Sequence, residues 1–262
     1  MKKNNQITSQ LIKNKFALFI FNLWLIFSLL LLTKMPTNAT EDDLEKLLPP
    51  LQIHPLPTTL EQWQDSNNLG NYFEQIKPIL AGYLIWSKLP IKVYLDRPSN
   101  PNDPAAVTRR FNQWLKAVEQ AIAEWNIYLS MIEVSEPEQA DIIIERNDPP
   151  LDTNINPETG KLQIPRARTA QTRYKFYIKN QQLFHQMTIQ ISPRLGELSV
   201  LSAARHELGH ALGIWGHSLE ETDALYFSQV GNPPTISSRD INTLKKIYQQ
   251  PTRLGWPLPS QF

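Results

Sequence analysis

The chain has 262 residues, of which 41% are hydrophobic and none is cysteine. This length and apolar content suffice for one well-packed domain with a small accessory region. The lack of cysteine excludes disulfides and thiolate metal ligands. The net charge of +1 lacks the strongly basic balance typical of nucleic-acid binding, so no nucleic-acid partner is expected.

The N-terminus predicts export. Four lysines within the first 15 residues precede a nearly unbroken apolar run over 16–32, and small residues at 37–39 suit cleavage after Ala39. We therefore interpret residues 1–39 as a signal peptide. An uncleaved membrane anchor is the alternative, because the 17 residues of the run are close to the about 20 apolar residues that a membrane span needs. Both interpretations place the rest of the chain outside the cytoplasm, in the periplasm or the extracellular space.

Removal of residues 1–39 would change the net charge of the chain. Residues 1–39 contain five lysines and no acidic residue, so the net charge falls from +1 to −4. A mildly acidic mature chain again argues against nucleic acid. Residues 40–82 are rich in proline and are expected to form a lead-in or linker, with a short helix near Thr59 to Trp63 and a propeptide as an alternative.

A strand and a long helix are expected next. Residues 83–95, interrupted at Pro90, predict a strand whose clearest part is 91–95. Asp103 as N-cap and Pro104 as the first helical residue open the helix. Apolar residues then recur at spacings of three and four: Phe111, Trp114, Leu115, Val118, Ala121, Ile122 and Trp125. This face should pack against a sheet.

Three further strands follow. They are predicted over 140–145, 173–178 and 183–191, the last two joined by a turn at Asn180 and Gln181. The loop between the first and the second has oxygen ligands at alternate positions: Asp152, Asn154, Asn156 and Glu158. It is compatible with Ca²⁺, but it lacks the glycine and terminal glutamate of an EF-hand, which favours a hydrogen-bonded turn.

The segment HELGHALGIWGH holds three of the five histidines, His206, His210 and His217. On a helix, residues 206 and 210 lie about 40° apart, so both imidazoles can bind one ion. Glu207 lies beside this face, where a carboxylate can take a proton from a zinc-activated water. The other two histidines, His54 and His185, have no partner at ligand spacing, and surface or core roles are expected for them.

The rest of this helix supports a metal site. Its opposite side is apolar, formed by Val200, Leu201, Ala204, Leu208, Ala211 and Leu212. Gly213 is positioned as a left-handed C-terminal cap, after which the chain can turn and bring in His217 as a third ligand. Three protein ligands leave a fourth zinc position open for water, which is typical of catalytic sites.

This segment resembles the metzincin zinc peptidases, most closely the matrixin-like branch, whose pattern is HExxHxxGxxH. Two positions depart from the family. His217 arrives one residue late, so the loop Ile214, Trp215 and Gly216 must absorb an extra residue, and Leu225 stands where the methionine of the family's turn below the zinc is expected. Leucine and methionine have similar volumes, so the exchange should be tolerated.

The resemblance implies roles for neighbouring residues. Asp223 is the alternative third ligand, or a loop cap or salt-bridge acceptor, and Tyr226 is expected to pack under the site rather than stabilise an oxyanion. The strand over 183–191 would be the sheet edge that pairs with an extended substrate. Without cysteine, the thiolate latch of many matrixins is excluded.

The fold implied is α+β: a metzincin-like domain over 83–250, with a twisted mixed sheet over a long helix and an active-site helix. A C-terminal helix capped by Ser237 or Ser238 ends before Pro251, and 251–262 form a tail. The resulting hypothesis is an exported, monomeric zinc endopeptidase acting on peptides or proteins. Two alternatives are a zinc-binding pseudoprotease that acts as a binding module and a membrane-tethered interaction protein that uses no metal.

Overall fold

The computed structural model describes residues 45–151, 154–155, 162–163, 168–228 and 233–259. The chain divides into two compact units, residues 1–47 and Leu48–Phe262, and every element named below lies in the second. The expected export segment, 1–39, lies outside the described residues. Among the described helices, none is long and apolar enough to cross a membrane.

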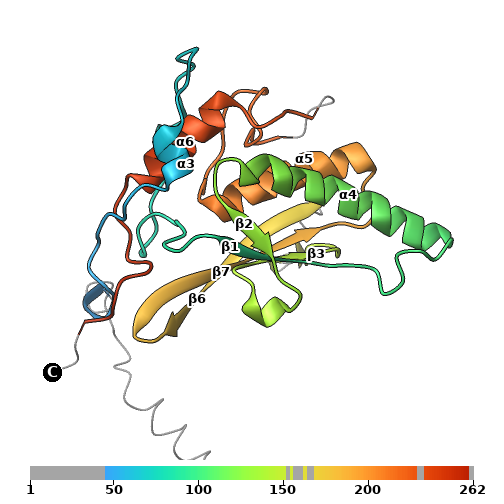
Figure 1. Cartoon of the computed structure of the whole chain (residues 1–262), viewed down its shortest axis with the longest axis horizontal. Helices are drawn as coiled ribbons and strands as arrows, with labels where there is room; N and C mark the ends of the chain where they lie inside the picture. The colour runs from blue at the N-terminus through green and yellow to red at the C-terminus, as the bar shows by residue number, and fades with distance from the viewer. Residues whose placement is uncertain (1–44, 152–153, 156–161, 164–167, 229–232, 260–262) are drawn as a thin grey trace, which may run out of the picture. The chain divides into compact units, whose positions relative to one another are not determined.

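The second unit is α+β and is built on a five-stranded mixed sheet (Figure 1). Its strands are, in spatial order, β2 (Met131–Glu133), β1 (Ile91–Leu95), β3 (Ile142–Glu145), β7 (Gln182–Ile191) and β6 (Ala170–Lys179). The first four run parallel, and β6 pairs antiparallel with β7. Strands β4 (Asn154–Ile155) and β5 (Leu162–Gln163) form a separate antiparallel pair.

One face of the sheet is buried, and the residues of β1, β3 and β7 on the other face are half-buried or exposed. Alternate residues of β1, β3 and β7 are buried, as the two-residue period of a strand requires. The register aligns Leu95, Ile144, Ile189 and Thr172 in one row across β1, β3, β7 and β6. Thr172 is therefore the β6 member of a row that faces the core.

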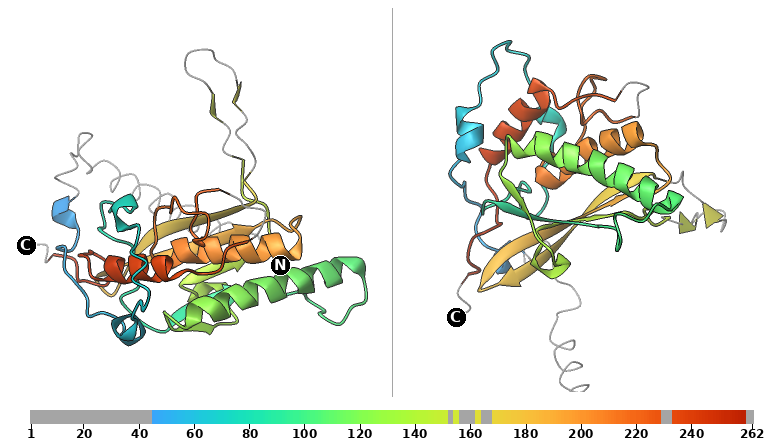
Figure 2. Two further views of the ribbon diagram at one scale, coloured as in Figure 1. Left: turned by 90° about the horizontal axis from the view of Figure 1, so that it is seen from above. Right: turned by 45° about the vertical axis from the view of Figure 1, so that its right-hand side comes forward.

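Helices α4 (Ala106–Asn126) and α5 (Glu197–Leu212) lie side by side on that buried face (Figures 1 and 2). Apolar packing joins them, and so does a bidentate ion pair in which Arg205 Nε and Nη2 lie 2.6 and 2.7 Å from the Glu124 carboxylate oxygens. The Trp125 indole N–H donates to the carbonyl oxygen of Arg205 over 2.9 Å. Helix α5, which carries His206 and His210, is thus held against a long helix on its apolar side.

Helix α6 (Ser238–Tyr248) begins at the predicted cap. The Ser237 hydroxyl accepts from the backbone N–H of Asp240, and the Asp240 carboxylate accepts from the Ser237 N–H, which completes a capping box. The short helix α3 (Thr58–Gln62) also lies where a helix is predicted. The turn at Asn180 and Gln181 is confirmed, because both residues have positive φ, 51° and 61°.

Segments on both sides of the predicted domain pack into the same unit. From Leu48 onward, the residues assigned to a lead-in contribute Leu60, Tyr72 and Ile76 to the core. The C-terminal tail pairs with this segment through reciprocal backbone hydrogen bonds between Gln52 and Thr252, 3.0 and 2.9 Å long. The compact unit therefore extends well beyond residues 83–250.

Three predicted details are wrong. Helix α4 begins at Ala106, because Ala105 is extended and the Asp103 carboxylate accepts from the Ala105 N–H before the helix starts. Residues 83–88 are not a strand, and β2 was not predicted. Strand β7 is not a sheet edge, because it pairs with β3 on one side and β6 on the other; β6 is the edge strand next to it, and β2 lies at the opposite edge.

Candidate metal centre

Helix α5 presents the arrangement that its sequence predicts. The six apolar residues of its back are buried: Val200, Leu201, Ala204, Leu208, Ala211 and Leu212. Gly213 follows with φ of +130° and donates its N–H toward the carbonyl oxygens of Gly209 and His210. A Cβ at this glycine would lie 2.6 Å from the Leu84 carbonyl oxygen, so both conformation and space require glycine.

The extra residue before the third histidine is absorbed by two tight turns. The Trp215 N–H donates to Gly213 O over 2.8 Å, and the Gly216 N–H donates to Ile214 O over 3.0 Å, each bond spanning two residues. Gly216 lies against the lead-in, since a Cβ there would be 2.7 Å from the Gln75 carbonyl oxygen. The longer loop thus brings His217 back toward the helix.

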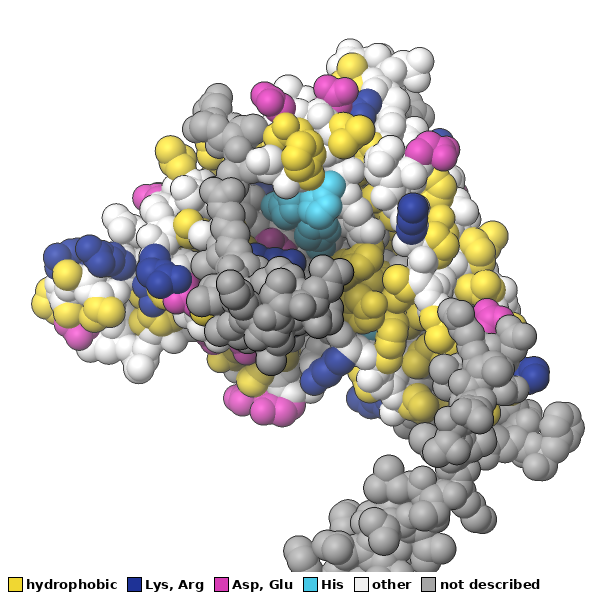
Figure 3. Space-filling view, turned by 180° about the vertical axis from the view of Figure 1, so that it is seen from behind, with side chains coloured by type: hydrophobic (Ala, Val, Ile, Leu, Met, Phe, Trp, Pro, Cys, Tyr) yellow, Lys and Arg dark blue, Asp and Glu magenta, His cyan; other side chains and the backbone are white. Residues whose placement is uncertain are grey.

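His206, His210 and His217 form a candidate metal-binding group, with one ligand nitrogen from each within 4.8 Å of the others. The ring centroids are 4.7 to 5.2 Å apart. The Nε2 atoms of His206 and His210 lie 3.1 Å apart, close to the about 3.3 Å expected for two nitrogens bound tetrahedrally to one zinc. Figure 3 shows histidine side chains gathered on one face, with apolar side chains beside them.

Backbone carbonyl groups orient the first two ligands. His206 Nδ1 lies 2.9 Å from Ala224 O, and His210 Nδ1 lies 2.7 Å from Ile214 O. Each Nδ1–H donates to its carbonyl oxygen, which leaves Nε2 with a free lone pair directed toward the shared position.

Burial keeps the imidazoles unprotonated. It lowers the pKa of His206 and of His210 to about 4, and it also lowers the pKa of His217. Neutral imidazoles are the form that binds a metal, so all three are ready as ligands at neutral pH.

Glu207 is held by the edge strand. Its side chain is 8% exposed, and the Thr172 hydroxyl lies 2.7 Å from Glu207 Oε2 and 3.0 Å from the Glu207 carbonyl oxygen. Burial raises the pKa of this carboxyl, opposed by the neighbouring His206 and by the Thr172 hydrogen bond. A carboxylate with raised pKa is a better proton acceptor near neutral pH than a solvated one.

Leu225 lies directly under the helix. It is fully buried, and its side chain fills the space beside Gly209, where a Cβ would overlap Leu225 Cδ2. Ala224, the preceding residue, supplies the carbonyl that orients His206. Leu225, which stands where the resemblance leads us to expect a methionine, thus packs against helix α5.

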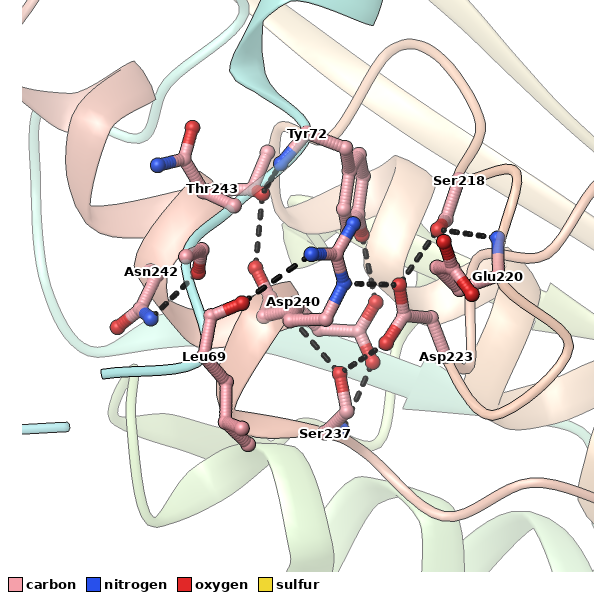
Figure 4. A network of polar contacts seen from close by, with 12 residues as sticks. Leu69, Tyr72, Ser218, Glu220, Asp223, Ser237, Asp240, Asn242 and Thr243 are labelled. Atoms are coloured by element: carbon pink, nitrogen blue, oxygen red, sulfur yellow. Dashed lines mark hydrogen bonds and ion pairs between the residues drawn. The ribbon is translucent and has the colours of Figure 1, made fainter. Parts of the chain in front are cut away.

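Asp223 anchors the loop after His217 rather than joining the histidines (Figure 4). Its buried carboxylate accepts hydrogen bonds from the hydroxyl groups of Ser218 and Ser237, and it forms a 3.0 Å ion pair with Arg239 Nε. It therefore acts as a salt-bridge acceptor, and the group of metal-binding side chains found among the described residues does not include it.

Asp240 supports the same loop from α6 (Figure 4). Its carboxylate accepts from the Tyr72 hydroxyl over 2.5 Å and from the Ala224 N–H over 2.9 Å. Because Ala224 O in turn orients His206, a hydrogen-bonded chain runs from the lead-in through α6 to a ligand. Burial raises the pKa of the Asp240 carboxyl, with the Tyr72 hydrogen bond opposing it.

The remaining candidates lie apart from this group. His185 is buried and stacks on Trp86 with ring centroids 4.0 Å apart, and His54 stacks on Trp256 at 4.2 Å; neither belongs to the metal-binding group found among the described residues. Tyr226 is half-buried against Phe227. The side chains of the candidate calcium loop, 152–158, lie outside the described residues.

The donor set fits zinc. Three neutral imidazoles with a buried carboxylate beside them match zinc's preference for nitrogen ligands and leave one position open. Sequence reasoning missed Thr172, Tyr72 and Asp240 as supporting residues, and no local pattern identifies them, because each acts across a long-range contact.

A scan against protein-family models and a search of curated proteins find no match to this chain.

Proposed function

We propose that this protein is an exported zinc metalloendopeptidase of the metzincin type. The observation that carries the proposal is the convergence of His206, His210 and His217 beside Glu207, with the third histidine brought in despite its displaced position. A structural zinc site would use a fourth protein ligand, and the described residues offer three.

Each residue of the group has a distinct role. His206, His210 and His217 would hold the ion. Bound zinc would supply Lewis-acid chemistry, lowering the pKa of a water and polarising the scissile carbonyl. Glu207 accepts the proton of the attacking water and delivers it to the leaving amine nitrogen. Thr172 positions Glu207 by donating to one carboxylate oxygen, so that the other remains available.

The architecture supports this proposal. A mixed sheet lies over a long helix and the helix that carries His206 and His210, and a further helix follows near the C-terminus, as the resemblance implies. The sheet ends at β6, whose Thr172 touches Glu207, so a peptide added to this edge would pass beside the histidines. A peptide or protein is therefore the proposed substrate.

Export belongs to the same proposal. The apolar run 16–32, preceded by lysines and followed by small residues, supports secretion or anchoring of the domain. No residue of the proposed mechanism lies in that segment, so cleavage and anchoring are both compatible with activity.

A zinc-binding pseudoprotease is the second candidate, and Leu225 in place of methionine favours it. The exchange removes the methionine thioether from beneath the site. The space itself stays filled, since Leu225 is fully buried against Gly209. A pseudoprotease would bind zinc and leave an unfolded protein intact.

The deciding experiment uses the full chain loaded with zinc and an unfolded protein as substrate. Wild-type protein should cleave it, and a chelator should stop cleavage until zinc is restored. Glu207→Gln should retain zinc and lose at least about 10²-fold in kcat/KM, because only the proton acceptor is removed.

Glu197→Gln is the matched control, since Glu197 lies exposed in the first turn of the same helix. It should keep wild-type activity. Zinc binding without hydrolysis by the wild type would establish the pseudoprotease instead. Absence of zinc, with normal folding when His206 and His210 are replaced, would indicate the interaction protein that uses no metal.

A further inference from the structure

The inner face of edge strand β6 carries apolar side chains at alternate positions beyond Thr172. They are Tyr174, Phe176 and Ile178, and we name these three residues the apolar row. In the sheet register they lie opposite Met187, His185 and Leu183, all of which are buried. The apolar row therefore belongs to the same face of the sheet as Thr172 and the metal-site helix.

The row begins at the metal centre. Tyr174 packs edge to face against Trp215, with ring centroids 5.0 Å apart, and Trp215 in turn packs against the ligand His210 at 5.8 Å. Trp215 belongs to the loop that absorbs the extra residue before His217. A run of aromatic side chains thus leads from a metal ligand onto the edge strand.

The row becomes more exposed with distance from the metal. Thr172 is 8% exposed, whereas Phe176 is 41% and Ile178 is 60% exposed. Helix α5 ends at Leu212, and the chain turns away at Gly213, so the outer half of the row extends past the helix. Figure 3 shows apolar side chains on the face that carries the histidines. Such an exposed apolar stretch beside a site is typical of a binding surface.

The outer edge of β6 offers backbone groups to a partner. Among the described strands, β6 pairs only with β7. A peptide that adds to this edge would place alternate side chains over the inner face, each about 5 Å from its neighbour on β6. Its remaining side chains would point to the opposite face.

From this geometry we propose that the apolar row is a substrate subsite, which selects peptides with apolar side chains at alternate positions on one side of the cleaved bond. This inference rests on the proposed peptidase function. At about 3.4 Å per residue, Tyr174, Phe176 and Ile178 lie about 7, 14 and 20 Å along the strand from Thr172. The selected positions are therefore two, four and six residues from the one opposite Thr172.

Peptide binding tests the inference without requiring hydrolysis. The probes are two labelled peptides that carry either leucine or serine at three alternate positions, and the protein is the full-length Glu207→Gln chain loaded with zinc. Leucine should bind more tightly, by roughly five-fold per position, because a good cross-strand pair contributes up to about 1 kcal/mol. The Phe176→Ser, Ile178→Ser double variant should lose the part of this preference due to those two positions.

Tyr177→Ser is the matched control. Tyr177 is adjacent in β6 and 37% exposed, but it points to the opposite face and stacks on Phe184. This variant should keep the preference for leucine. With wild-type protein, the cleavage sites in an unfolded protein should show the same alternation on one side of the cut bond.

Several results would overturn the inference. Equal binding of the leucine and serine peptides would do so, as would a preference that survives in the double variant. If instead the double variant loses binding to phosphatidylglycerol vesicles and keeps its peptide preference, the row is a lipid contact. Selective binding without any cleavage by wild type would refute the peptidase proposal and leave the subsite established.

Discussion

Replacing Gly209 by alanine probes the contact between helix α5 and Leu225, which lies beneath the candidate metal centre. Gly209 lies in the interior of α5, between the two helical ligands. A Cβ at this position would overlap Leu225 Cδ2 and lie 3.2 Å from Leu225 Cδ1 and Cγ. Favourable carbon contacts are about 3.5–4.0 Å, so the leucine must shift.

Two opposing effects determine how much Gly209→Ala changes the free energy of unfolding. Alanine is more favourable than glycine in a helix interior by about 0.5–1 kcal/mol. Overpacking a filled core costs about 1–3 kcal/mol, and Leu225 has no solvent to move into because it is fully buried. We therefore expect Gly209→Ala to lower the free energy of unfolding by about 1 kcal/mol, although helix propensity alone predicts an increase.

A double-mutant cycle isolates the contact. Leu225→Ala alone should cost about 3 kcal/mol, as expected for truncating a buried leucine. In that background Gly209→Ala should become stabilising by about 0.5–1 kcal/mol, because the obstacle is gone and only helix propensity remains. Denaturant unfolding of the four zinc-free proteins measures all the terms. Zinc affinity should also fall in Gly209→Ala, since Ala224, beside Leu225, orients His206.

The sign of the stability change caused by Gly209→Ala tests whether Gly209 and Leu225 are in contact. If Gly209→Ala stabilises the protein that retains Leu225, the helix and the loop are not in the described contact. The same conclusion follows if Gly209→Ala has equal effects in both backgrounds. The support of His206 by the segment around Leu225 would then need a different explanation.

Three other changes give measurable outcomes. Tyr72→Phe should lower the free energy of unfolding by about 1–3 kcal/mol, because the buried Asp240 carboxylate loses a hydrogen bond; an unchanged denaturant midpoint would contradict this. Glu124→Ala should cost about 3 kcal/mol by leaving the Arg205 guanidinium, 7% exposed, without its carboxylate partner, and the Glu124→Ala, Arg205→Met double variant should recover part of the loss. Burial lowers the pKa of His185 to about 3 from an unfolded value near 6.5, so the unfolded chain binds the extra proton and stability falls as pH decreases between these values. His185→Phe should reduce the pH dependence of stability in this window by up to about 1.4 kcal/mol per pH unit, and an unchanged slope would show that His185 is not buried as described.

Local patterns predicted the parts of the site that lie on one element. The four-residue spacing of His206 and His210, the apolar back of α5 and the capping glycine all follow from helix geometry, and the structure contains each of them. The N-cap of α6 was likewise predicted, at Ser237 or Ser238, because a cap involves residues only a few positions apart; the structure places it at Ser237. The same holds for the hairpin turn at Asn180 and Gln181.

The order of the strands in the sheet could not be predicted from local sequence patterns. The periodicity of 183–191 identifies a strand with one buried face, but the pattern is the same for a central strand and for an edge strand. Only long-range pairing places β7 between β3 and β6 and leaves β6 at the edge. The proposed substrate-binding edge is therefore β6 rather than β7, and β6 carries Thr172, which contacts Glu207.

The sequence by itself determined the chemistry available to this protein: two imidazoles and a carboxylate on one helix, a third imidazole shortly after it, and an apolar N-terminal segment. The tertiary structure decided whether these groups meet. His217 reaches the other ligands because the loop is held by Asp223, and His206 is oriented through Ala224 and Asp240. Such contacts join residues from separate elements, so their formation depends on the packing of the whole domain rather than on local spacing.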